Sequence, residues 1–124
     1  MFKFWAIVLA AFGLDQGTKL LVQRWLDPGQ IVEVFEPYLR FTYVLNPGAA
    51  FGILGNYQPV LLLASLVAVV LLLGALPWMI KARYIWPAGF LLGGALGNLI
   101  DRLRHGRVVD FLDLGFWPVF NIAD

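Results

Sequence analysis

The fold class is decided by the stretch Val60–Ile80, which reads VLLLASLVAVVLLLGALPWMI. It carries no charged residue, and Ser65 is its only hydroxyl side chain. A helix rises about 1.5 Å per residue, so a run of this length can cross the roughly 30 Å hydrocarbon core of a bilayer. The whole chain has 124 residues, of which 60% are hydrophobic and 14% charged. The sequence therefore predicts an α-helical membrane protein.

Two further helices are expected on either side of this run. The first extends from about Phe4 to Leu26; its start could pass for a signal peptide, but no small-residue cleavage site follows, so we interpret it as a retained span. The second extends from about Tyr84 to Asp101, and in it Gly89, Gly93 and Gly97 are spaced by four. Glycines at this spacing form a ridge against which another helix can pack closely. We therefore expect three transmembrane helices.

Between Gln30 and Val44 the sequence changes from long apolar runs to short β-prone segments. These segments, Ile31–Phe35 and Leu39–Val44, are separated by the turn signal Glu36-Pro37. Unpaired strand edges are not tolerated in the hydrocarbon region of a membrane, so we expect the strands to lie outside it. The sequence thus predicts a small β-rich element outside the membrane.

The basic residues between the second and third helices indicate the orientation. Lys81 and Arg83, together with Lys3, are expected on the cytoplasmic side by the positive-inside rule. Six other Lys and Arg residues then lie on the outer side, which opposes this orientation by raw count, and all eight acidic residues fall there as well. We keep the orientation because several of those six basic residues lie at helix ends or in polar motifs.

Polar side chains on the first and third helices are candidates for a functional site, because ionisable groups so close to apolar spans are costly. Asp15 and Lys19 are four residues apart, the spacing of an ion pair on one helix face. The pair is either purely structural or a support for a site. Asn98, Asp101 and Arg102 share a face near the end of the third helix, where Arg102 can complement the helix dipole or present its planar fork to a peptide carbonyl.

The remaining polar motifs lie in connections. Asn46–Gly52 is rich in small residues and is either a plain turn or a place where a peptide backbone comes close. Asp110 follows two valines in a short connection, and Asn121 and Asp124 have the spacing of a helix N-cap and its third residue. There is no cysteine, no Ser/His/Asp arrangement and no zinc-ligand spacing. A pair of aspartates is therefore the only hydrolytic machinery evident, although spacing alone does not choose the pair.

These motifs resemble those of the lipoprotein signal peptidases (signal peptidase II), and they occur in that family's order. The matching stretches are Asp15–Lys19, Asn46–Phe51, Gly97–Arg102, Val108–Phe111 and Phe120–Asp124. The resemblance implies an aspartyl endopeptidase that removes signal peptides from diacylglyceryl-modified prolipoproteins. It also implies a multi-pass protein of the bacterial cytoplasmic (inner) membrane, in contact with phospholipid, with its active site and an extracytoplasmic β-rich cradle on the outer face. Inhibition by cyclic peptide antibiotics is expected on the same ground.

The resemblance also assigns roles to residues. It implies that Asp110 and Asp124, not Asp101, form the catalytic pair. The residues expected to bind substrate or support the site are Asp15, Lys19, Asn46, Gly48, Asn98, Arg102 and Asn121. Structural roles are expected for Asp101, Gly93 and Gly97.

The expected mechanism is general acid/base catalysis. Two carboxyl groups close together in a partly apolar site do not both ionise readily, so one can donate a proton while the other activates water. No metal or cofactor is expected, because His105 is the only histidine and is interpreted as a solvated loop residue. A formal net charge of +1 gives no indication of a nucleic-acid partner.

Two expectations concern the class and extent of the protein. The family has four membrane helices, so residues 1–124 are expected to be a single peptidase domain that is C-terminally truncated relative to the family. A chain ending at Asp124 would place an α-carboxylate beside the catalytic pair, and we expect it to be inactive or nearly so. One alternative is a small channel or transporter subunit that uses intramembrane Asp and Arg side chains. Another is a non-catalytic helix-packing protein, which the glycine ridge would support.

Overall fold

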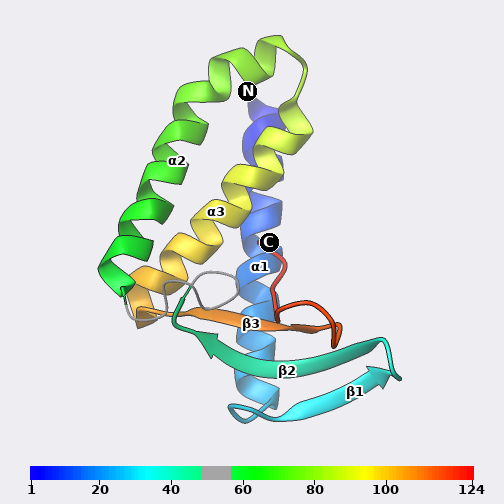
Figure 1. Cartoon of the computed structure of the whole chain (residues 1–124). Helices are drawn as coiled ribbons and strands as arrows, with labels where there is room; N and C mark the ends of the chain where they lie inside the picture. The colour runs from blue at the N-terminus through cyan, green and yellow to red at the C-terminus, as the bar shows by residue number, and fades with distance from the viewer. Residues whose placement is uncertain (49–56) are drawn as a thin grey trace.

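The computed structural model describes residues 1–48 and 57–124. Within this part of the chain there are three helices and a small sheet (Figure 1). In chain order these elements are α1 (Phe2–Trp25), β1 (Ile31–Phe35), β2 (Leu39–Asn46), α2 (Gln58–Lys81), α3 (Ile85–His105) and β3 (Val108–Asp113). Residues 49–52 of the small-residue motif lie outside the described residues.

Two of these helices, α1 and α2, are long and apolar enough to cross a membrane. The predicted run Val60–Ile80 lies within α2, which begins with a proline in its first turn, where the missing N–H is not needed for the helix. The third predicted helix is present as α3. It is less apolar than the other two because its last turns carry Asp101, Arg102 and Arg104.

The end of α3 differs from the prediction. The helix does not stop near Asp101 but continues to His105, and Gly106 then adopts a left-handed conformation with φ of 66°. The Gly106 N–H donates to the Arg102 carbonyl, which closes the helix end. The interpretation of His105 as a loop residue was wrong, because the helix ends only at the left-handed Gly106. The His105 side chain is exposed in the last helical turn.

The helix α3 packs against both α1 and α2, whereas α1 and α2 do not contact each other in the described residues. Its contact with α1 is close because the facing residues are glycines. A Cβ built on Gly89 would lie 2.6 Å from Ile7 Cγ2, and one built on Gly93 would lie 2.8 Å from the Val8 carbonyl oxygen. The backbones of α1 and α3 thus approach each other along the predicted ridge.

The sheet is antiparallel with the order β1-β2-β3. The predicted strands match β1 and β2, but β3 was expected to be a connection and that expectation was wrong. Its sequence, VVDFLD, is β-prone, and pairing with β2 supplies its backbone with hydrogen-bond partners. The register sets Val44 opposite Asp110 and Asn46 opposite Val108. Pairing with β2 therefore brings the Asn46 motif next to Asp110.

The sheet lies at one end of the helices, and three basic residues lie at the other. Figure 1 shows the start of α1 and the α2–α3 connection at one end, and the sheet at the other. Lys3 lies in the first turn of α1, Lys81 ends α2 and Arg83 lies in the α2–α3 connection. These three basic residues are thus at the end remote from the sheet.

Candidate active site

Asp110 lies in β3 and is 3% exposed. Its Oδ2 accepts a hydrogen bond from Asn46 Nδ2 at 2.8 Å, and its Oδ1 accepts one from Asn121 Nδ2 at 2.7 Å. The Asn46 amide cannot turn round freely, because its Oδ1 accepts the Gly48 N–H at 2.9 Å. Two amide donors from different segments therefore fix the Asp110 carboxyl in place.

Asp124 is held by Asn121 and Asn98. Its Oδ2 accepts the Asn121 backbone N–H at 3.1 Å, while Asn121 Oδ1 accepts the Ala123 N–H at 2.8 Å. This is the reciprocal bonding of a helix N-cap, as the spacing allowed. Asp124 Oδ1 accepts from Asn98 Nδ2 at 3.2 Å. Because the side-chain amide of Asn121 also donates to Asp110, this one buried residue bridges the two aspartates.

Behind these aspartates lies a buried cation. Lys19 is 2% exposed, and its Nζ donates to Asp15 Oδ2 at 2.8 Å and to Asn98 Oδ1 at 3.0 Å. It also forms an ion pair with Asp101, with 2.7 Å between Nζ and Oδ2. The ion pair expected between Asp15 and Lys19 is present, but Lys19 is shared with a second carboxylate from α3. Three side-chain oxygen atoms, from Asp15, Asn98 and Asp101, therefore surround the ammonium group.

Asp101 joins three elements. Besides the bond to Lys19, its Oδ1 accepts from Gln16 Nε2 at 3.0 Å, and its Oδ2 accepts the Val109 N–H at 3.3 Å. Asp101 thus ties α3 to α1 and to the residue just before Asp110. Removing one member of a buried charge cluster leaves the others uncompensated, so this cluster is expected to stabilise the fold only when it is complete.

Two glycines of α3, Gly94 and Gly97, leave room for segments that pack directly against them. A Cβ built on Gly97 would overlap the Asp15 carboxylate. A Cβ built on Gly94 would lie 2.5 Å from the Ala123 carbonyl oxygen and 3.1 Å from Ala123 Cα. Any side chain at Gly94 would therefore push against the backbone that carries Asn121 and Asp124.

The two aspartates line a common cleft of about 370 Å³. Its lining consists of Asn46, Gly48, Asn98, Arg102, Val108, Asp110, Trp117, Pro118, Val119, Phe120 and Asp124. The cleft thus places two carboxyl groups, two amides and one guanidinium group beside an apolar wall. Such an arrangement can bind a peptide bond and exchange protons with it.

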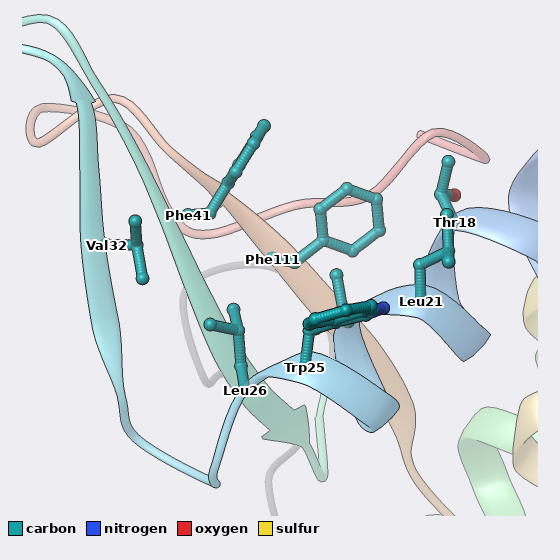
Figure 2. A pocket seen from close by; sticks show the side chains of 8 residues that line it. Thr18, Leu21, Trp25, Leu26, Val32, Phe41 and Phe111 are labelled. Carbon is teal, nitrogen blue, oxygen red and sulfur yellow. The ribbon is translucent and has the colours of Figure 1, made fainter.

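A second groove, of about 280 Å³, lies between the last turns of α1 and the sheet (Figure 2). Its lining is apolar apart from Thr18 and includes Leu21, Trp25 and Phe111. Asp110 lines the polar cleft while its neighbour Phe111 lines this groove, because successive side chains of a strand point to opposite faces. The strand β3 therefore separates an apolar face from the face that carries the carboxylate.

The electrostatic environment of Asp110 favours its protonated form. Burial raises the pKa of Asp110 to about 6, and the nearby negative charge of Asp124 contributes to this rise. The hydrogen bonds from Asn46 and Asn121 act in the opposite direction and lower the pKa. The pair can therefore hold one proton close to neutral pH, as a general acid/base pair requires.

Comparison with known proteins assigns this arrangement to a family. Residues 7–124 match the sequence model of the family described as Signal peptidase (SPase) II. The chain belongs to the signal peptidase II family. The lipoprotein signal peptidase of Moorella thermoacetica is 42% identical to it, over 98% of this chain and 82% of the relative. That of Pelotomaculum thermopropionicum is 44% identical, over 100% of this chain and 82% of the relative.

Solved structures agree with this assignment to signal peptidase II. One, described as a bacterial membrane enzyme, has a TM-score of 0.88 and 31% identity, and the match covers 100% of this chain and 79% of that one. Another with the same description has a TM-score of 0.84 and 32% identity, covering 100% and 84%. The expected function as a lipoprotein signal peptidase of the aspartic type is confirmed, and the alternative of a channel or transporter subunit is set aside.

Most residues that the sequence proposed for the signal peptidase II site converge in space. Those joined by hydrogen bonds or ion pairs are Asp15, Lys19, Asn46, Gly48, Asn98, Asp101, Asp110, Asn121 and Asp124. Arg102 lines the same cleft, and Gly97 lies against Asp15. Gly93 lies further along α3, in the contact with α1 and away from the cleft.

Sequence reasoning gave no role to two residues that contact this signal peptidase II site. Gln16 belongs to the Asp15–Lys19 motif, and its amide reaches Asp101 across the helix interface. Gly94 adjoins Gly93 but faces the segment that carries Asp124. A second glycine beside the ridge was the available signal for Gly94, since adjacent glycines on one helix let two different segments approach.

Proposed function

We propose that Asp110 and Asp124 are the catalytic pair with which this peptidase removes signal peptides from diacylglyceryl-modified prolipoproteins. The observation that carries the proposal is the Asn121 bridge, which holds both carboxyl groups at one cleft while Asp110 is 3% exposed. Asp101, the other candidate, pairs with Lys19 and accepts hydrogen bonds from Gln16 Nε2 and the Val109 N–H. It does not line the cleft.

The proposed reaction needs one proton on the pair. The ionised carboxylate removes a proton from a water molecule, which attacks the scissile carbonyl carbon. The protonated carboxyl group donates its proton to the carbonyl oxygen as the tetrahedral intermediate forms. Collapse of the intermediate breaks the C–N bond, and the proton taken from water passes to the leaving amine. As the C=O bond re-forms, the carboxylate that gave up its proton takes one back from a hydroxyl group of the intermediate. The pair thereby returns to its starting state, and no covalent intermediate is formed.

Other cleft residues are proposed to bind the peptide. Arg102 has a planar fork of donors and is attracted to the negative charges of Asp124 and Asp110, so it can hold a substrate carbonyl beside them. Asn46 and Gly48 line the same cleft and lie on and just after β2. A buried small residue such as Gly48 lets an extended peptide backbone come close to Asp110.

We further propose that all three helices span the bacterial cytoplasmic membrane and that the sheet lies on its extracytoplasmic face as a cradle beside the site. Lys3, Lys81 and Arg83 lie at the end remote from the sheet, which supports a cytoplasmic location for that end. No acidic residue accompanies them there, since the first acidic residue of α1 is Asp15 and the first of α3 is Asp101.

The proposed substrate and chemistry are tested with purified protein that is extended after Asp124 by the C-terminal membrane helix of a family member, because a chain ending at Asp124 is expected to be inactive or nearly so. This extended protein is the background of every variant below. Its substrate is a diacylglyceryl-modified prolipoprotein, with the unmodified precursor as control. We expect release of the signal peptide from the modified precursor only, inhibition by cyclic peptide antibiotics, and full activity in the presence of a chelator. The chelator arm tests the proposal that carboxyl groups alone carry out the proton transfers. Loss of activity with a chelator and its return with one metal ion would contradict the mechanism.

The pH dependence tests the shared proton. Because the pKa of Asp110 is raised to about 6, its proton is lost as the pH rises through that region, and kcat/KM is expected to fall there. The Asn46 hydrogen bond lowers this pKa, so Asn46→Ala should move the alkaline limb of the pH profile to higher pH. An alkaline limb that stays in place or moves to lower pH in this variant would contradict the assignment.

A further inference from the structure

The orientation of the Asn98 side chain is determined by Lys19. An ammonium group can only donate hydrogen bonds, so the Asn98 atom 3.0 Å from Lys19 Nζ must be the amide oxygen. Asn121 Nδ2 donates to the same oxygen at 3.1 Å, which gives the oxygen two donors. Turning the amide round would set an NH₂ group against two donors. The amide nitrogen is therefore forced to face Asp124 Oδ1, which lies 3.2 Å away.

This orientation has a chemical consequence for the catalytic pair. An N–H directed at Asp124 Oδ1 places a donor against that oxygen and stabilises negative charge on it. The other oxygen, Oδ2, already accepts the Asn121 backbone N–H.

We propose that Lys19 is a positioning residue of the peptidase, and that through the Asn98 amide it keeps Asp124 as the ionised, water-activating member of the pair. The inference rests on the proposed function and goes beyond it by assigning the base. Lys19 does not line the cleft and is not a catalytic residue. Its own position is fixed by its ion pairs with Asp15 and Asp101.

The measurement is the pH profile of kcat/KM for the diacylglyceryl-modified precursor, normalised to folded protein. The acid limb reports the ionisation of the base, here assigned to Asp124. The charged groups that face this part of the site are Asp15, Asp101, Arg102, Asp110 and Asp124. Lys19 also acts on Asp110 through space, so its removal alone affects both carboxyl groups.

The decisive variant is therefore Asn98→Asp. The new carboxylate still accepts from Lys19 and Asn121, which preserves the buried cluster, but it turns an oxygen instead of an N–H toward Asp124. We expect the acid limb to move to higher pH and kcat near neutral pH to fall by about 100-fold, because the base is harder to ionise. An unchanged acid limb would overturn the proposal.

Lys19→Met tests whether Lys19 acts through Asn98. In the wild-type background we expect a similar fall in kcat with KM unchanged. In an Asn98→Ser background, Lys19→Met should cause little further shift of the acid limb, because the amide that Lys19 orients is absent. An equal shift in both backgrounds would contradict the proposal and make Lys19 a through-space charge only.

Controls separate this inference from its premises. Arg104→Met removes one positive charge from an exposed position of α3 and should leave the profile unchanged. If Lys19→Met does not fold, Asn98→Asp still tests the link from the Asn98 amide to Asp124, because it leaves the Asp15–Lys19–Asp101 cluster in place; an unchanged acid limb in that variant overturns the proposal. If the extended protein without substitutions does not cleave the modified precursor, the proposed function fails; if it cleaves and the acid limb never moves, only this inference fails.

Discussion

Asp110→Asn is expected to reduce prolipoprotein cleavage by about 10²- to 10⁴-fold, the usual contribution of a general acid or base. The amide has nearly the same volume as the carboxyl group but can neither hold the shared proton nor act as a base. It also sets an NH₂ group against Asn46 Nδ2 or Asn121 Nδ2, both of which are donors. Asp124→Asn should have a loss of the same order, because each member of the pair needs the other.

The matched control is Asp113→Asn. Asp113 lies in the same strand, but its carboxylate pairs with Arg40 at 2.8 Å and does not line the cleft. This partly exposed ion pair contributes little to stability, so the variant should fold and cleave normally. Turnover is to be measured per folded molecule, with the melting temperature of each variant in detergent. Substantial turnover by Asp110→Asn, or an equal loss in Asp113→Asn, would contradict the assignment of the pair.

Gly94→Ala is expected to lower kcat by about 100-fold while the helices remain packed. The new Cβ would lie 2.5 Å from the Ala123 carbonyl oxygen, so the segment that carries Asp124 must move away from α3. A displacement of about 1 Å at a catalytic group can cost that much in rate. The hydrogen bond between Asn98 Nδ2 and Asp124 Oδ1, already 3.2 Å long, would be lost first.

Two other glycines serve as comparisons for this variant. At Gly93 the added Cβ would meet the α1 backbone at 2.8 Å, so Gly93→Ala should destabilise the α1–α3 contact by about 1–3 kcal/mol. At Gly74 nothing lies within 4 Å, so Gly74→Ala should leave both melting temperature and turnover unchanged. If Gly94→Ala lowers the melting temperature as much as Gly93→Ala and keeps full turnover per folded molecule, the segment is not held in place by α3.

The sequence by itself determined the features that depend on near neighbours in the chain. The length and composition of Val60–Ile80 are enough to specify a spanning helix, because such a helix satisfies its own backbone hydrogen bonds. The ion pair of Asp15 with Lys19 follows from a spacing of four on one helix. The cap formed by Asn121 and Asp124 follows from a spacing of three.

Sequence motifs also named most of the side chains that meet at the site, through resemblance to a family. They did not say how those side chains are connected. Asp101 was expected to have a structural role, but the sequence did not show that it shares Lys19 with Asp15 or that it receives the Val109 N–H. Nor did spacing choose Asp110 and Asp124 over Asp101, since all three are aspartates close to apolar segments.

Only the tertiary structure decided these connections, because each depends on groups far apart in the sequence. Gln16 reaches Asp101 across 85 positions, and Asn46 reaches Asp110 across 64. The strand β3 forms because β2 offers it backbone partners, which its own sequence cannot reveal. Local sequence sets what each segment can do alone, whereas the burial of Asp110 and the direction of each amide are set by the segments packed around them.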